Sequence, residues 1–303
     1  MKKRTRGLRV CAAIALLALA GIGLLAYPVV SNYLFVVHAS EGIQSYEQSV
    51  EDKGGEEELA GLWAKAEAYN ENLEGNPAHD PFLTGSGMAL GDDYAQVLDL
   101  GTDGLMGYIQ IPKIGVKLSI FHGMQDKVLS KGVGHLEGSS MPIGGEGSHS
   151  VLAAHSGLAQ ARLFTDLTEL RTGDDFYIHV LDKVLAYRVD QITTVLPEET
   201  DTLRRSGTED YCTLVTCTPY GINTHRLLVR GVRIEYIKEA EETQLSAAAS
   251  SAHNWVAVRN SLLGVLLGAA AGLLLLALYV AIRAIRRRVL THSSKAEGFW
   301  WEA

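Results

Sequence analysis

Two long uncharged runs near the ends of the chain limit what this sequence can fold into. Residues 10–30 and 261–282 are apolar or small, and each run is long enough to cross roughly 30 Å of hydrocarbon as a helix. Basic residues precede the first run, and Arg283, Arg286, Arg287 and Arg288 follow the second. Because basic residues stay on the cytoplasmic side, we predict two transmembrane helices, both termini in the cytoplasm and the intervening chain outside the cell.

The first run has a second interpretation, as a cleaved signal peptide. Ala18, Leu19 and Ala20 resemble a processing site. Cleavage there would leave another ten apolar residues on the product, so we favour an uncleaved anchor.

The charge of the chain between the two runs limits its partners. Residues 31–258 contain 33 acidic and 16 basic side chains, a difference of −17. Nucleic acids are bound by basic patches, so this balance argues against a nucleic-acid partner. It also argues against a domain that lies flat on an anionic membrane.

Residues 105–238 read as β-structure almost throughout. Short β-branched and apolar segments alternate with Gly and Pro, and a helical pattern interrupts them only around residues 163–170. The expected strands are residues 108–111, 116–121, 150–154, 176–181, 185–189, 191–196, 212–216 and 226–236. Eight short strands at this spacing predict a mainly β fold, a closed or nearly closed barrel.

The segment before the barrel divides into a helix and a loop. In residues 56–73 the apolar side chains fall on one helical face, which predicts a docking helix. Residues 75–91 are rich in Gly and Pro, yet Asp80, Pro81 and Phe82 stand in the middle. Phe82 either pins this loop to the core or belongs to a lid, with Phe82 filling a pocket and Asp80 pairing with a cation inside it.

Residues 211–230 predict a strand, a turn and a return strand. Cys217 ends the first strand and Arg226 opens the second, so a thiol and a guanidinium can face each other across the hairpin mouth. Positive charge favours the thiolate, which is the nucleophilic form of cysteine. Cys212 lies five residues earlier, on the opposite face of the strand, so an intrastrand disulfide is not expected. The alternative is that Cys217 is a small buried hydrophobic residue.

Three histidines are candidate partners for Cys217. His225 adjoins Arg226 and points to the other face of a regular strand, and His149 lies in a Gly- and Ser-rich stretch. His155 ends an apolar strand, so like Cys217 it is delivered at a strand terminus. A zinc site is the rival interpretation, but no pair here has metal-ligand spacing, and we expect neither a metal nor another cofactor.

These residues resemble the sortases, cysteine transpeptidases of Gram-positive bacteria. The resemblance rests on the sequence TLVTC ending at Cys217, on His155 and Arg226, and on the segments 108–115 and 223–231. Asp80-Pro81-Phe82, the preceding helix and the second membrane run resemble the pilin-polymerising branch, class C. Ser156 departs from the pattern, since a larger or charged residue is expected there.

The resemblance implies an eight-stranded barrel with its active site on the rim. Cys217 would cleave an LPXTG-like sorting signal between Thr and Gly and form a thioester, with His155 as acid and base and Arg226 holding the substrate carbonyl. A lysine of another pilin subunit would accept the acyl group. Asp80 and Phe82 would be lid residues that cover the site.

The resemblance also implies a division of the chain. We expect a cytoplasmic N-terminus, a signal anchor, an extracellular helical segment, a lid loop with linker, a catalytic barrel, a second linker, a second membrane helix and a cytoplasmic tail. Their bounds are residues 1–9, 10–30, 31–74, 75–104, 105–240, 241–260, 261–282 and 283–303.

Three alternatives remain open at this stage. A sortase could attach proteins to the cell-wall precursor instead of to a pilin. An exported cysteine hydrolase could release its product to water. A membrane-tethered β-domain could bind a partner with Cys217 merely buried.

Overall fold

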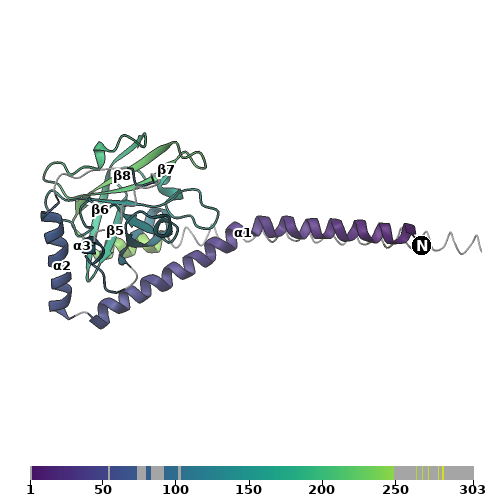
Figure 1. Cartoon of the computed structure of the whole chain (residues 1–303), viewed down its shortest axis with the longest axis horizontal. Coiled ribbons are helices and arrows are strands. Elements are labelled where there is room, and N and C mark those ends of the chain that lie inside the picture. The colour runs from purple at the N-terminus through teal and green to yellow at the C-terminus, as the bar shows by residue number, and fades with distance from the viewer. Residues whose placement is uncertain are drawn as a thin grey trace, which may run out of the picture. The chain divides into compact units, whose positions relative to one another are not determined.

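Eight strands close into a barrel in the computed structural model (Figure 1), which describes residues 2–53, 55–73, 80–82, 92–101 and 104–248 and five isolated positions between 264 and 282. The strands are β1 Leu105–Ile111, β2 Val116–His122, β3 Val133–His135, β4 His149–Ala153, β5 Asp175–Val180, β6 Lys183–Val195, β7 Tyr211–Thr218 and β8 His225–Ile234. The helices are α1 Lys2–Lys53, α2 Glu56–Glu71, α3 Asp92–Ala95 and α4 Asp126–Leu129, with 3-10 helices at Pro112–Ile114, Thr165–Glu169 and Asp201–Leu203.

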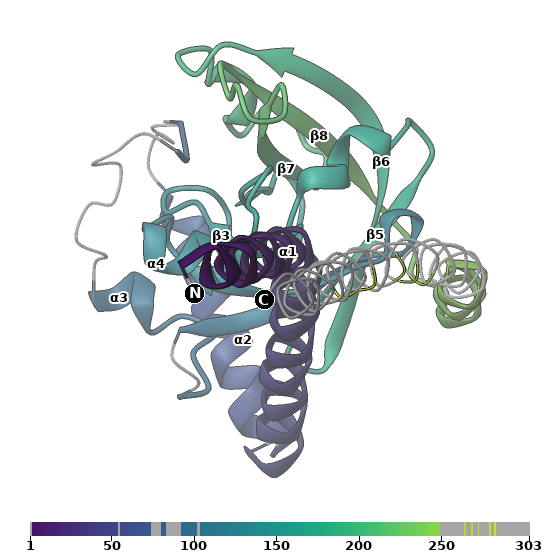
Figure 2. The same cartoon turned by 90° about the vertical axis from the view of Figure 1, so that its right-hand side faces the viewer.

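The order of the strands around the barrel is β1-β2-β3-β4-β7-β8-β6-β5, and β5 pairs with β1 to close it. All neighbours are antiparallel except β2 with β3 and β4 with β7. β8 lies between β7 and β6 (Figure 2). Each of the eight strands has a hydrogen-bonded neighbour on both sides, which confirms the predicted eight-stranded barrel.

Two of the expected strands form one, and one observed strand was not expected. The expected segments 185–189 and 191–196 fall on the single strand β6, which ends at Val195 and whose register against β8 shifts between Val189 and Gln191. β3 is only three residues long and contains Gly134, where a Cβ atom would lie 2.4 Å from the Gly123 carbonyl oxygen. A strand this short has no readable alternation, and its close approach requires glycine. The helical pattern expected around residues 163–170 is the 3-10 helix Thr165–Glu169.

Alternation along the strands fills the interior of the barrel with apolar side chains. Leu152 of β4, Leu214 of β7 and Val229 of β8 belong to this main core. Val151, Val215 and Leu228, their neighbours in sequence, point to the other face of the same strands and join a second cluster. The two clusters therefore lie on opposite faces of the β4-β7-β8 sheet.

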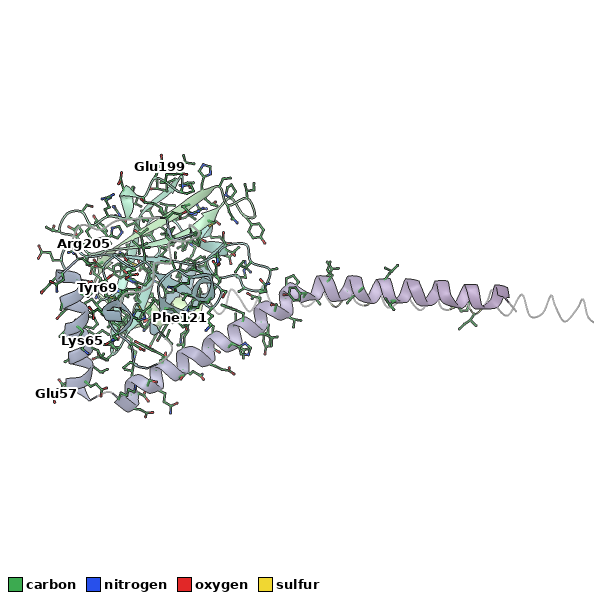
Figure 3. The ribbon with its side chains drawn as sticks, viewed as in Figure 1. Glu57, Lys65, Tyr69, Phe121, Glu199 and Arg205 are labelled. Atoms are coloured by element: carbon green, nitrogen blue, oxygen red, sulfur yellow. The ribbon has the colours of Figure 1, made fainter. Side chains whose placement is uncertain are left out.

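Helices α1 and α2 both hold the barrel through tyrosines. Tyr46 of α1 is buried, and its hydroxyl bonds the Met106 carbonyl and the Leu181 amide. The hydroxyl of Tyr69 on α2 accepts from the Gly138 amide. Arg205 lies at the same end of α2 as Tyr69 (Figure 3) and donates to the Asn70 carbonyl. The predicted docking helix over residues 56–73 is thus confirmed.

The chain separates into two compact units, residues 30–250 and residues 1–29 with 251–303. Among the described residues, one helical stretch, Ala20–Lys53, is long and apolar enough to cross a membrane. It begins within the first predicted span, residues 10–30. The second predicted span, residues 261–282, lies outside the described residues apart from the isolated positions.

A helix after β8 is joined to the barrel through one buried carboxylate. Residues 238–248 are helical, and Glu241 is buried. Its carboxylate accepts hydrogen bonds from Gln110 at 3.1 Å and Tyr236 at 2.8 Å and pairs with His179 at 3.0 Å. Burial by itself would raise the pKa of Glu241, but the bonds from His179 and Tyr236 lower it. The helix is therefore part of the folded barrel.

We predict that Glu241→Ala lowers the free energy of unfolding by about 3 kcal/mol at neutral pH, because it leaves buried donors without their acceptor. A lowered carboxyl pKa stabilises the fold above the ordinary pKa, and that contribution is lost as the pH falls through the lowered value. The difference between wild type and variant should therefore shrink in acid. Urea denaturation followed by circular dichroism measures it, with exposed Glu239→Ala as control. Equal midpoints for both variants would contradict the prediction.

Candidate functional site

The register of β7 and β8 brings Cys217 and Arg226 together. The two residues are direct partners in the antiparallel ladder, one pair before its last partners, Thr218 and His225. Both share the sheet face of Val215 and Leu228, not the face that fills the main core. Cys217 is 9% exposed and Arg226 8%. The thiol and the guanidinium therefore lie side by side at the rim, as the hairpin pattern predicts.

His155 reaches the same rim from the neighbouring strand. β4 runs parallel to β7, with Ala153 opposite Val215, so the next residues of both segments leave the sheet in the same direction. The ring of Phe82 lies between the candidate groups: its centroid is 5.5 Å from that of His155 and 5.2 Å from the Arg226 Cζ. This ring joins His155 to Arg226, and Cys217 belongs to the same group as the strand partner of Arg226.

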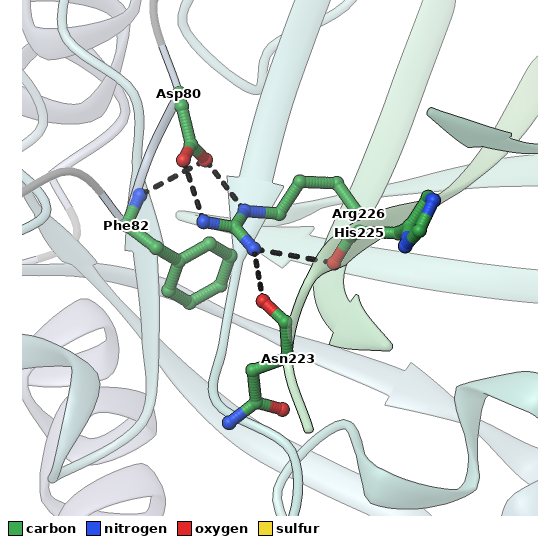
Figure 4. Close-up of polar contacts among 5 residues, drawn as sticks. All are labelled: Asp80, Phe82, Asn223, His225 and Arg226. Atoms are coloured by element: carbon green, nitrogen blue, oxygen red, sulfur yellow. Dashed lines mark hydrogen bonds and ion pairs between the residues drawn. The ribbon is translucent and has the colours of Figure 1, made fainter. Parts of the chain in front are cut away.

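Asp80 forms a two-bonded ion pair with Arg226 (Figure 4). Arg226 Nε donates to Asp80 Oδ1 at 2.8 Å, and Nη2 donates to Oδ2 at 2.6 Å. Nη1 donates to the carbonyls of Asn223 and His225, and Asp80 also accepts from the Phe82 amide. Asp80 is 1% exposed. A bidentate ion pair of this kind is strong and directional. It stabilises both charges, which are buried and have lost their hydration.

The covered site favours uncharged forms of the thiol and the imidazole. Burial raises the pKa of Cys217, and Asp80 raises it further, while Arg226 opposes both. Burial lowers the pKa of His155, and the charge of Asp126 partly offsets this. With Asp80 and Phe82 in place, both pKa shifts thus act in the direction of the thiol and the neutral imidazole.

A cluster of buried apolar side chains continues from the site on the same sheet face. We call it the second cluster; its buried members are Met124, Leu129, Leu136, Val151, Ala153, Leu203, Val215 and Leu228. Phe82 and Val195 pack against it. Phe82 thus makes apolar contacts beside the site that a bound ligand could replace.

The other histidine candidates have different surroundings. His149 is buried, its Nδ1 bonds the Arg204 carbonyl, and its Nε2 bonds the Thr213 hydroxyl. Since a carbonyl only accepts, Nδ1 carries the proton and Nε2 accepts from Thr213. The ring of His225 bonds the hydroxyl of its neighbour Thr224. Across the described part of the chain, no three His, Cys, Asp or Glu side chains are grouped to hold a metal ion.

Sequence reasoning missed two features of the site. The second cluster draws on three strands, β4, β7 and β8, and on segments near Met124, Leu136 and Leu203, which no single stretch of sequence indicates. The Ser156 hydroxyl donates to the Cys217 carbonyl at 2.6 Å. Ser156 stands out in the sequence only as a departure from the expected residue type, which does not reveal this bond.

Comparison with known proteins agrees with this fold and site. The sortase domain family matches residues 109–234. The structure of sortase C-1 from Actinomyces oris is 46% identical and covers 59% of this chain and 99% of its own, with a TM-score of 0.57. Sortase C of Streptococcus pneumoniae is 43% identical and covers 65% and 97%, with a TM-score of 0.59. The pilus-related sortase C of group B Streptococcus is 44% identical and covers 64% and 97%, also with a TM-score of 0.59.

Curated relatives match over a shorter range. Sortase A of Bacillus anthracis is 27% identical over 141 residues, 46% of this chain and 65% of that protein. Sortase A of Streptococcus agalactiae is 30% identical over 117 residues, which make up 38% of this chain and 47% of that protein. The chain therefore spans about half to two thirds of the length of these relatives.

The chain belongs to the sortase family, whose members are cysteine transpeptidases. The solved structures named above are all sortases of class C, the branch that the sequence resembles.

We predict that replacing Asp80 and Phe82 together by Ala speeds the alkylation of Cys217 by iodoacetamide at pH 7 by at least about tenfold. The change removes the ring that packs against His155 and Arg226 beside the thiol, and it removes a charge that raises the pKa of Cys217, so the rate profile should also move to lower pH. Mass spectrometry of the labelled chain measures the rate. Asp190→Ala is the matched control and should leave the rate unchanged. It removes the carboxylate partner of Arg230, which lies on β8 like Arg226. An unaltered rate in the double variant would contradict a covering role.

Proposed function

We propose that this chain is a membrane-anchored cysteine transpeptidase that joins pilin subunits. The observation that carries the proposal is the pairing of Cys217 with Arg226 at the rim, with Phe82 in contact with both His155 and Arg226. Likeness to sortases of class C, one of them described as pilus-related, supports the choice of pilins.

The first half-reaction makes a thioester. The substrate displaces Asp80 and Phe82, and His155 takes the proton of the Cys217 thiol. The sulfur attacks the carbonyl carbon between Thr and Gly of an LPXTG-like signal, and Arg226 stabilises the oxygen on which negative charge develops. The C–N bond then breaks, and His155 returns its proton to the departing glycine amine.

The second half-reaction transfers the acyl group to an amine. His155 removes a proton from a lysine amine of another pilin subunit, and the amine nitrogen attacks the thioester carbon. The C–S bond breaks, and the proton returns from His155 to the sulfur. The products are an isopeptide bond and the resting thiol, so the enzyme is unchanged.

The second cluster supports recognition of the apolar part of the signal. Its side chains lie on the sheet face of Cys217, and Phe82 packs against them. A signal whose leucine and proline bury apolar surface there would replace the contacts of Phe82, while its carbonyl oxygen would replace Asp80 on Arg226. Substrate and lid residues would then compete for the same two contacts.

The membrane anchors would serve the transfer step. We propose that both termini are cytoplasmic and that the barrel lies on the outer side of the membrane. A membrane-tethered pilin and a tethered enzyme meet at a high effective concentration, which favours a lysine amine over more dilute acceptors.

We predict that the full-length chain in detergent, incubated with an LPXTG-type peptide, gains the mass of the peptide up to its Thr, and that Cys217→Ala does not. Adding a lysine-containing peptide should release a joined product and deplete the thioester. Product released mainly to water would favour a hydrolase, and transfer only to a cell-wall precursor amine would favour the anchoring branch. No mass change on Cys217 would contradict the proposal.

We predict that Arg226→Lys lowers kcat for transfer by about 10²–10³ with little change in KM, because lysine keeps the charge but cannot hold an oxyanion with a fixed fork. Steady-state kinetics of peptide transfer measure both constants. Arg230→Lys is the matched control, since Arg230 makes an equivalent two-bonded pair with Asp190 on the same strand and face. Similar losses in the two variants would show that the fork at residue 226 has no special role.

A further inference from the structure

The parallel ladder between β4 and β7 ends just before the site. Its last partners are Ala153 and Val215, and one more backbone bond joins the Ala154 amide to the Val215 carbonyl at 3.2 Å. His155 and Cys217 both follow this point. Their relative position therefore depends on what joins the two segments beyond the ladder.

Two buried hydroxyl groups make that joint. Thr216 Oγ1 donates to the Ala154 carbonyl at 2.8 Å, and Ser156 Oγ donates to the Cys217 carbonyl at 2.6 Å. Each segment supplies one donor and one acceptor. The two bonds enclose His155 between its bonded neighbours and fix the peptide group that follows the Cys217 Cα.

The Ser156 bond matters most when the lid residues have left. Within the part of the chain that the structure describes, no hydrogen bond reaches the ring of His155; its neighbours are the Phe82 ring and the charge of Asp126. Substrate binding would remove Phe82. The two hydroxyl bonds, together with the bond from the Phe164 amide to the His155 carbonyl at 3.1 Å, would then remain to hold the backbone that carries the imidazole beside the thiol.

We propose that Ser156 is a positioning residue, which sets the geometry of the Cys217–His155 pair by fixing the Cys217 carbonyl and does not itself touch the substrate. The expected effect of Ser156 on peptide transfer rests on the proposed function. Its effect on the reactivity of the thiol is separate from the identity of the substrate. Misplacement of reacting groups by even 1 Å can slow a reaction by about a hundredfold, so loss of one such bond should be measurable.

The test uses the full-length chain in detergent with Asp80→Ala and Phe82→Ala, so that Cys217 is open to iodoacetamide. Ser156→Ala should slow alkylation at pH 7 by about tenfold, and Ser156→Thr, which keeps the hydroxyl, should restore most of the rate. Because Ser156 acts through His155, combining Ser156→Ala with His155→Gln should be no slower than His155→Gln alone. Ser148→Ala is the matched control, since its buried hydroxyl donates to Asp210 Oδ1 at 3.0 Å and contacts none of the candidate site residues. It should change unfolding midpoints but not alkylation.

The outcomes separate this inference from the proposed function. Three results would overturn the positioning role. Ser156→Ala could leave the alkylation rate unaltered, or His155→Gln could leave it unaltered. The double change Ser156→Ala with His155→Gln could also slow alkylation by the product of the two single effects. In the chain with its lid residues intact, Ser156→Ala should lower kcat for peptide transfer and leave KM unchanged. If the wild type forms no acyl-enzyme, the proposed function fails. The alkylation rates of the single and double variants at Ser156 and His155 still decide the role of Ser156.

Discussion

The antiparallel pairing of β7 with β8 is the interaction on which the rest of the site depends. It sets Cys217 opposite Arg226 and turns both side chains away from the main core. Ladder hydrogen bonds fix this register along eight residue pairs, and a slip by one residue would send the thiol into the interior. His155, Asp80 and Phe82 all take their places relative to that pair, so the chemistry of the rim follows from strand register.

Much of the fold could be predicted because its signals are local. Alternating β-branched residues, broken by Gly and Pro, indicate strands, and the expected segments 116–121, 176–181 and 212–216 match β2, β5 and β7 to within two residues at each end. The predicted number of strands is right although two expected segments form β6 and β3 was not expected. β3 depends on Gly134 and on partners distant in sequence, which periodicity does not report. Closure of the barrel is likewise a property of the whole chain.

The site divides in the same way between local and distant signals. Strand ends indicated Cys217, Arg226 and His155, and the odd aromatic in a Gly-rich loop indicated Phe82. The sequence could not reveal that one ring contacts both His155 and Arg226, because the loop and β8 are 146 residues apart at the Asp80–Arg226 pair. Nor could it reveal the Ser156 bond, which depends on two segments leaving a parallel ladder together. Catalytic roles for these residues stay a prediction.

The pleat of β7 also determines what oxidation can do to this protein. Cys212 faces the interior of the barrel and is fully buried, whereas Cys217 faces outward, and both are free. Sulfur atoms on opposite sides of one strand cannot reach the roughly 2 Å separation of a disulfide without breaking the sheet. An oxidant can therefore not inactivate Cys217 by joining it to Cys212, because the strand that carries both thiols holds them on opposite sides of the barrel wall.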